Sequence, residues 1–416
     1  MVETSTTPLT GPTRLIILAD DLSGAADCAV SFARAGLKTS IELARKSLNQ
    51  AEVVVFDTDS RHLAPEAAAA VNVDTWRSVR SSGPGLYKKI DSTLRGNWAQ
   101  EVAALIPEAG MAIVAPAMPL MKRYTRGARQ YIDDTPVEQT PVWQNEGRQG
   151  RASLDGLLDE VGVESAYLSL DALRNTPVDA LGRLLLGHRD RGVGAVVCDA
   201  ETDEDLDCLA RAARQLSGIF WVGSAGLSNA ICASLLSGKA ANAQPGVTVA
   251  GPVLTVVGSM SAISHRQVDH LLAQGGENMA CFTVAIDELL ASTEIPEALA
   301  GAQRAIERGQ DVLVTLARQA PDASINGYAL SQRLASHLGG HLDRIGALVA
   351  TGGETARALL GAADIDRMRL LDELEPGVAL SVTSLGAPVV TKAGAFGREQ
   401  TLTEVWQTLV RRRAPR

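Results

Sequence analysis

Short apolar runs rich in β-branched residues recur along the chain, and longer stretches with helical periodicity separate them. One series lies at 15–19, 53–57, 86–90, 112–115, 195–198 and 219–222, and a second at 253–257, 279–283, 312–315, 347–350 and 389–391. Strands that alternate with helices of about 10–15 residues are typical of parallel sheets covered by helices on both faces. The pattern therefore predicts an α/β protein with two mostly parallel sheets, each flanked by helices.

A stretch of small, polar, Pro- and Gly-containing residues, GKAANAQPGVTVAGP at 238–252, separates the two series of apolar runs. This composition is typical of a linker between domains. We therefore predict a flexible N-terminal tail at 1–12, a first domain at 13–238, a linker at 239–252 and a second domain at 253–416.

Composition narrows the classes of partner. Lys and Arg number 39 against 48 Asp and Glu, giving a net charge of −9, and aromatic residues make up only 4% of the chain. This balance disfavours nucleic acid as a partner. The longest uncharged stretches contain Gly, Pro and Ser, so no membrane span is expected. The five cysteines are scattered without a C-x-x-C pair, which predicts neither a disulfide framework nor a zinc site and favours a cytoplasmic location.

Charged and hydroxyl side chains follow three apolar runs of the first half, in ADDLSGAAD (19–27), FDTDSRHL (56–63) and YKKIDSTLRGN (87–97). Ligands of open α/β sheets bind outside the carboxyl ends of the strands, so these side chains are candidates for one site. Asp20 and Asp21 could hold a hydroxyl, accept its proton or face a metal ion, although one of them could simply cap a helix.

The cations of these motifs indicate an acidic small molecule. The planar fork of Arg61 suits a carboxylate, although pairing with an aspartate of its own motif is an equal alternative. Lys88 and Lys89 should point to opposite faces of a strand, so we expect only one of them to reach the site. Ser92 or Thr93 at a helix start would offer backbone N–H groups to an anion.

A further segment, APAMPLMKRYTRGARQYI at 115–132, holds four cations in a Pro-rich, non-periodic stretch. Two interpretations are equal here: a loop that closes over an anionic ligand, and an exposed basic loop.

In the second half, glycine-rich turns replace the charged clusters, in VVGSMS (256–261), ATGGET (350–355) and TKAGAFG (391–397). Such turns let backbone amides approach phosphates closely, which favours a nucleotide site. Neither the G-x-x-x-x-G-K-[ST] loop nor the G-x-G-x-x-G fingerprint is present, and tight turns also need glycine for structural reasons. Ser224 lies in WVGSAG, where Val222 replaces the first glycine of a nucleophile elbow, so a serine hydrolase is disfavoured.

Together these motifs resemble, in order and over almost the whole chain, the four-carbon acid sugar kinases. The resemblance implies an N-terminal domain for the sugar acid, a C-terminal domain for ATP, and an active site in the cleft between them. It implies ATP-dependent phosphorylation of a terminal hydroxyl with Mg²⁺ on the ATP phosphates. D-threonate, giving the 4-phosphate, is the first choice of substrate, and 3-oxo-tetronate and D-erythronate are the alternatives.

The resemblance and the residue types also assign candidate site residues. The sugar-acid contacts are expected from Asp20, Asp21, Arg61, Lys89, Ile90, Asp91 and Ser92. The ATP contacts are expected from Ser259, Gly352, Gly353, Glu354, Thr355, Gly394 and Gly397. Asp20 and Asp91 are the catalytic candidates, with Asp20 ranked first as proton acceptor, and the metal ligands stay unassigned. A non-catalytic sensor of sugar acid and nucleotide is the alternative from another class, and the sequence leaves open whether the chain forms a homo-oligomer.

Overall fold

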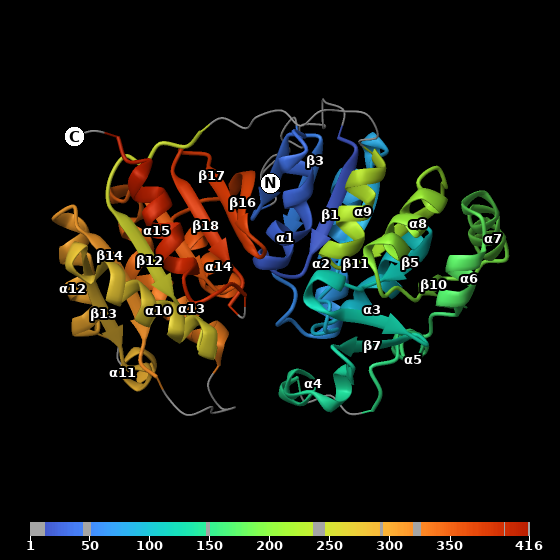
Figure 1. Cartoon of the computed structure of the whole chain (residues 1–416), viewed down its shortest axis with the longest axis horizontal. Coiled ribbons are helices and arrows are strands. Elements are labelled where there is room, and N and C mark those ends of the chain that lie inside the picture. Colours follow the sequence, from blue (N-terminus) through green and yellow to red (C-terminus); the bar gives the residue numbers. More distant parts are fainter. Residues whose placement is uncertain are drawn as a thin grey trace, which may run out of the picture. The chain divides into compact units, whose positions relative to one another are not determined.

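The structure, a computed structural model, describes residues 13–44, 51–146, 150–235, 246–291, 294–318, 326–394 and 396–414. The chain forms two compact units, the first drawn from 1–39 and 47–242 and the second from 40–46 and 243–416 (Figure 1). The expected N-terminal tail and residues 239–245 of the expected linker lie outside the described residues.

The first unit is built on a parallel sheet. Its strands lie in the order β3 (Val53–Asp57), β1 (Leu15–Ala19), β4 (Gly85–Lys89), β11 (Ile219–Gly223), β5 (Met111–Ala115), β10 (Ala195–Cys198) and β9 (Ser165–Leu168). Six of the seven are confirmed predictions, and the seventh, β9, is short and partly exposed. Every residue of β1 is buried, as expected for a strand covered on both faces.

Helices form two layers on this sheet (Figure 1). One layer contains α1 (Leu22–Arg34), α9 (Ala225–Leu235), α8 (Asp203–Ala213), α7 (Val178–Asp190) and α6 (Leu170–Asn175), and the other contains α2 (Pro65–Val79), α3 (Trp98–Ala109) and α5 (Leu154–Asp159). Alternate residues of β1, Ile16 and Leu18, share one core cluster with Trp76 of α2 and Trp98 of α3. The period of two along the strand thus supplies both helix layers with apolar side chains.

The cationic segment that was expected to be a loop is an antiparallel ribbon of β6 (Arg123–Arg126), β7 (Arg129–Ile132) and β8 (Thr135–Pro136). Both residues of its first turn, Gly127 and Ala128, have positive φ, of 60° and 56°, as in the hairpin turns that match strand twist. The Asp199 carboxylate accepts both of their N–H groups, at 2.8 and 3.0 Å. This carboxylate stabilises the turn. The sequence does not predict such a turn, because alanine rarely adopts a left-handed conformation.

The second unit has a mixed sheet. Five parallel strands, β13 (Met279–Val284), β14 (Asp311–Leu316), β12 (Val253–Val257), β15 (Ala347–Thr351) and β18 (Pro388–Lys392), continue into antiparallel β17 (Val378–Thr383), β16 (Arg367–Glu375) and β2 (Thr39–Glu42). The five parallel strands are confirmed predictions. Residues 40–46, which the sequence placed in the first domain, belong to the second unit, where Ile41 pairs with Met368.

Helices cover this second sheet as well. One group comprises α11 (Ile286–Ala291), α12 (Glu297–Glu307), α13 (Gly327–Leu338) and α14 (Gly353–Ala362), and the other comprises α10 (Ala262–Gly275) and α15 (Thr401–Arg411). The described half of the expected linker packs on this unit: Val249 is buried and its N–H and C=O pair with Arg412 and Ala414. Within the described residues, no helix has both the length and the apolar character needed to cross a membrane.

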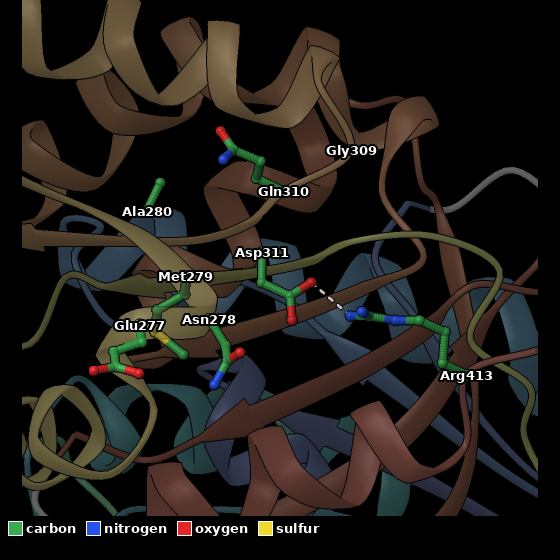
Figure 2. A pocket seen from close by; sticks show the side chains of 8 residues that line it. All are labelled: Glu277, Asn278, Met279, Ala280, Gly309, Gln310, Asp311 and Arg413. Carbon is green, nitrogen blue, oxygen red and sulfur yellow. Dashed lines mark hydrogen bonds and ion pairs between the residues drawn. The ribbon is translucent and has the colours of Figure 1, made fainter. Parts of the chain in front are cut away.

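Asp311, the first residue of β14, joins three segments of the second unit. Its Oδ1 accepts from the backbone N–H of Val253 at 2.9 Å and from Arg413 at 2.5 Å, and its Oδ2 accepts from the indole of Trp406 at 2.9 Å. Figure 2 shows the Asp311–Arg413 pair beside a cavity of about 270 Å³. This cavity lies at the amino ends of β13 and β14, away from the carboxyl ends where ligands of such sheets bind.

We predict that Asp311→Ala lowers the free energy of unfolding of the second unit by about 3–5 kcal/mol, because it leaves an indole and a backbone N–H buried without acceptors beside an arginine. Denaturant unfolding of the full chain measures the loss. Arg413→Met removes only one of the three donors and should cost less. Equal losses in the two variants would contradict a role for all three bonds.

Candidate active site

The side chains after β1, β3 and β4 come together because β1 lies between the other two strands. Ala19, the last residue of β1, is in register with Asp57 on one side and with Lys89 on the other. The predicted residues Asp20, Asp21, Arg61, Lys89, Asp91 and Ser92 therefore all follow or end neighbouring strands at one edge of the sheet.

Arg61 binds the two aspartates that follow β1. Its Nε donates to Asp20 Oδ2 at 2.8 Å, and one terminal nitrogen donates to Asp20 Oδ1 at 3.0 Å and to Asp21 Oδ1 at 2.8 Å. Arg61 therefore pairs with aspartates of another motif, whereas the alternative expected pairing within its own. Asp21 also caps α1, accepting from the N–H of Gly24 at 3.0 Å, so the capping role belongs to Asp21.

Asp20 is an ionised carboxylate with acceptor capacity left. Burial raises the pKa of Asp20, but the positive charges of Arg61, Lys88 and Lys89 outweigh this effect and lower the pKa below its usual value. Each of its two oxygens accepts one hydrogen bond from Arg61 among the described residues. Since a carboxylate oxygen has two lone pairs, Asp20 can accept a further donor such as a hydroxyl.

Asp91 is held much more tightly. Its Oδ2 accepts from the N–H and hydroxyl of Thr93 and from the backbone N–H and Nε of Arg95, and its Oδ1 accepts from another nitrogen of Arg95 at 3.0 Å. Burial raises the pKa of Asp91, yet Arg95 and its neighbours hold it well below the usual range. The expectation of a helix start with free N–H groups at Ser92 or Thr93 is wrong, because Asp91 takes the N–H of Thr93 and α3 begins only at Trp98.

The two lysines of β4 point to opposite faces, as expected. Lys88 is fully buried, 2.9 Å from Glu101 Oε2, and donates to Asn72 Oδ1 at 3.1 Å. Lys89 reaches the other face, where a Cβ added to Gly24 would lie 2.7 Å from its ammonium nitrogen. Gly24 lies in the first turn of α1, which Asp21 caps, so Lys89 is the lysine that lies beside the aspartate cluster.

Ile90, a predicted substrate contact, and Ser60, which precedes Arg61, both have structural roles. Ile90 is fully buried, and its N–H donates to Gly223 O at 2.9 Å, so its side chain belongs to the core. The Ser60 hydroxyl donates to Glu101 Oε1 at 2.5 Å, which ties the loop that bears Arg61 to the buried Lys88–Glu101 pair. Sequence reasoning missed Glu101, because a helical glutamate looks like an ordinary exposed residue.

Ser92 is contacted by the β6–β7 hairpin. Its hydroxyl accepts from Arg123 at 2.5 Å, and its carbonyl accepts from the side chain of Gln130 at 2.7 Å. The sequence signal for Arg123 was only the cluster of cations in its segment.

The glycine turns of the second unit also meet at one sheet edge, since β12, β15 and β18 are neighbours. A Cβ on Gly394 would lie 2.5 Å from Ser259 Oγ, and one on Gly258 would lie 2.0 Å from Thr355 Oγ1. Gly352 has a φ of 93°, and α14 begins directly after it. At Gly258 and Gly394 the backbone lies so close to neighbouring side chains that no Cβ would fit. The N-terminus of α14 lies at the same sheet edge.

Two of the predicted nucleotide residues are placed differently. Glu354 is exposed in the first turn of α14. Gly397 has a φ of 87° and lies against Thr401 and Glu375, where a Cβ would come within 2.6 and 2.7 Å of their oxygens. These contacts relate Gly397 to the start of α15 rather than to the turn around Gly394.

Lys392, the last residue of β18, is a fully buried lysine that the sequence analysis did not select. Its ammonium donates to the carbonyls of Ala393, Gly394 and Phe396 at 3.0–3.2 Å. Burial lowers the pKa of Lys392 to about 8, with Glu375 opposing the shift. The buried ammonium therefore holds the last glycine turn in place through hydrogen bonds to its carbonyls.

Family models match both units: residues 15–231 match a sugar-binding N-terminal domain, and residues 254–402 match a nucleotide-binding C-terminal domain. A D-threonate kinase of Cupriavidus necator is 44% identical over 96% of this chain and 99% of its own length. The chain belongs to the four-carbon acid sugar kinase family. Other family members are less similar: a D-threonate kinase of Bordetella bronchiseptica is 34% identical over 95% of this chain and 98% of its own, and a D-erythronate kinase of Heliobacterium modesticaldum is 30% identical over 92% and 94%.

Solved structures with this family's fold include a Haemophilus influenzae protein, with a TM-score of 0.75 and 18% identity over 95% of this chain and 100% of that protein. A Salmonella typhimurium protein has a TM-score of 0.78 and 18% identity over 95% and 99%. At this level of identity the likeness concerns the fold alone.

We predict that Lys392→Met raises the KM for ATP about tenfold or more while the chain stays folded, because three carbonyls lose their shared donor and the turn loosens. Steady-state kinetics with varied ATP measure this change. In the unsubstituted chain the KM for ATP should also rise as pH passes through about 8, since a neutral amine has fewer and weaker donors.

Arg398→Met is the matched control, because Arg398 lies on the same loop but is exposed and pairs with Glu375 and Glu404. An unchanged KM in Lys392→Met, or the same change in Arg398→Met, would contradict the proposed role of the buried ammonium.

Proposed function

We propose that this chain transfers the terminal phosphate of ATP to the terminal hydroxyl of a four-carbon sugar acid, with D-threonate as the substrate and its 4-phosphate as the product. The observation that carries the proposal is the cluster of aspartates, arginines and Lys89 at the carboxyl edge of the first sheet. It occurs in a chain that matches a D-threonate kinase over nearly its full length. Such a cluster suits a small ligand with both hydroxyls and a carboxylate.

Asp20 is the group that we assign to the reacting hydroxyl. It is ionised, it directly follows β1, which lies between β3 and β4, and Arg61 is the residue that donates to its two oxygens, whereas Asp91 Oδ2 alone accepts four hydrogen bonds from Thr93 and Arg95. Arg61 fixes its orientation with two hydrogen bonds. Phosphoryl transfer needs mostly positioning and charge neutralisation, and a carboxylate held in this way orients the hydroxyl and takes its proton.

The turns after β12, β15 and β18 are assigned to ATP, through Ser259, Gly352, Gly353, Thr355 and Gly394. Their support is the meeting of the three turns at one sheet edge and the helix N-terminus at Gly353, where N–H groups and the helix dipole favour an anion. The shared cleft between the two sites stays a prediction.

Mg²⁺ is assigned with the nucleotide. Among the described residues, no group of three or more His, Cys, Asp or Glu side chains could hold a metal by itself. Mg²⁺ is commonly held by the phosphate oxygens of its nucleotide with only one or two carboxylates, so its ligands in this chain stay unassigned. When bound, Mg²⁺ neutralises charge on the transferred phosphate.

Two other functions have weaker support. Ser224 is buried and donates its hydroxyl to Ala117 O at 2.8 Å, a structural bond that gives no support to a serine hydrolase. A non-catalytic sensor would bind the same ligands, but it would not need an ionised carboxylate with an open lone pair at Asp20. We assign the enzyme to the cytoplasm, in keeping with its five unpaired cysteines.

The experiment that tests the function is ADP release from ATP and Mg²⁺ with D-threonate, D-erythronate and 3-oxo-tetronate, and with a three-carbon acid as the control. We expect the highest kcat/KM with D-threonate. A higher value with another tetronate would change the substrate but keep the reaction. Binding of the acid without ADP release would support a sensor, and neither binding nor release with any tetronate would refute the proposal.

We predict that Asp20→Asn lowers turnover about 10²–10⁴-fold, the usual contribution of a general base, while the affinity for ATP stays within twofold. Single-turnover phosphorylation and nucleotide binding measure the two effects, and thermal unfolding checks the fold. Asp91→Asn is the comparison, because five hydrogen bonds from Thr93 and Arg95 hold Asp91 in a structural role, so its substitution should affect stability more than chemistry. Near-normal turnover in Asp20→Asn together with a collapse in Asp91→Asn would move the base to Asp91.

A further inference from the structure

Arg123 is a cation beside the sugar-acid cluster that no family motif assigned. It begins β6, is partly buried, and donates from a terminal nitrogen to the Ser92 hydroxyl at 2.5 Å. Burial lowers the pKa of this guanidinium, and Asp91 partly opposes the shift. A guanidinium keeps its proton in proteins, so Arg123 brings a partly desolvated positive charge to the site.

The charge of Arg123 is not paired with a carboxylate in the part of the chain that the structure describes, where the neighbouring Asp91 pairs with Arg95. The Nε of Arg123 is buried there without a hydrogen-bond partner. A desolvated charge with open donors is costly unless a ligand supplies the missing acceptors. A carboxylate supplies two acceptors in one plane, which is the geometry that the guanidinium fork matches.

The other arginines of the cluster are already engaged. Arg61 uses its Nε and one terminal nitrogen on Asp20 and Asp21, and Arg95 forms a two-bonded pair with Asp91. Arg123 is thus the arginine of this cluster whose fork has not met a carboxylate among the described residues.

The hairpin holds Arg123 in a fixed place. Thr125, on the same face of β6, is buried and exchanges two backbone hydrogen bonds with Ala200, at 2.9 and 3.1 Å. Gln130 on β7 binds the carbonyl of Ser92, and Thr125 binds the Gln130 side chain at 2.8 Å. A charge anchored in this way is preorganised for a ligand and loses little entropy when the ligand binds.

We propose that Arg123 binds the carboxylate of the sugar acid and so selects acids over neutral four-carbon polyols and amides. The inference rests on the proposed function and assigns one end of the substrate: the carboxylate lies toward Ser92 and the hairpin, and the reacting hydroxyl lies toward Asp20. Lys89, a single ammonium beside the aspartates, is then left for the hydroxyls or the transferred phosphate.

The test compares D-threonate with its neutral amide, threonamide, in the full-length chain. Arg123→Gln can still donate to Ser92 but has lost the charge and the fork. We expect its kcat/KM for threonate to fall about 100-fold, and its kcat/KM for threonamide to stay within threefold. Arg126→Met is the matched control, because Arg126 lies on the opposite face of β6, is exposed and pairs with Glu201. It should keep the preference for the acid.

Two results would overturn the inference: threonate kinetics within threefold of the unsubstituted chain, or equal losses for threonate and threonamide, which would make Arg123 only a support for Ser92. If Arg123→Gln fails to fold by thermal unfolding, Arg123→Lys keeps the charge without the fork and should lose about tenfold for threonate alone. Calorimetric binding of threonate without ATP separates this inference from the proposed function. Weakened binding in Arg123→Gln supports the inference even if no phosphate is transferred.

Discussion

The pairing of buried charges at one sheet edge is the constraint on which the first unit depends. Arg61 bridges from the loop after β3 to the two aspartates after β1, and the Lys88–Glu101 pair fixes the same loop from the opposite face of the sheet. Buried ions that lose a partner are strongly destabilising, so these contacts fix the loops as well as the charges. The geometry of the proposed sugar-acid site therefore depends on the same contacts as the stability of the strand ends that bear it.

The two units build the edges of their sheets by different means. The first unit uses charged side chains on neighbouring strand ends, whereas the second uses backbone turns in which glycine removes the side chain altogether. In the second unit the buried ammonium of Lys392 donates to three carbonyls inside the turn. In the proposed function, specificity for a particular acid therefore rests on side chains of the first unit, and the turns of the second unit bind the phosphates of ATP.

The sequence predicts the parallel strands because they are buried on both faces and read as uninterrupted β-branched runs. It also predicts which strand ends hold polar side chains. It does not show that Asp91 consumes the N–H of Thr93, or that Asp199, more than 70 positions away, stabilises a turn with Ala128 in a left-handed conformation. Those features depend on contacts between distant residues, and the placement of Arg123 depends on the same hairpin.

Residues 40–46 belong to the second unit although they precede most of the first, which affects both synthesis of the chain and division of its gene. Ile41 emerges early from the ribosome, but its partner Met368 on β16 is made only near the end of translation. The second unit therefore cannot complete its sheet until almost the whole chain exists, whatever the speed of the first unit. A fragment that starts at the apparent boundary near residue 243 would lack β2 and leave an open strand edge prone to self-association. The two units are distinct in structure, but a gene fragment that starts near residue 243 does not encode the whole second unit.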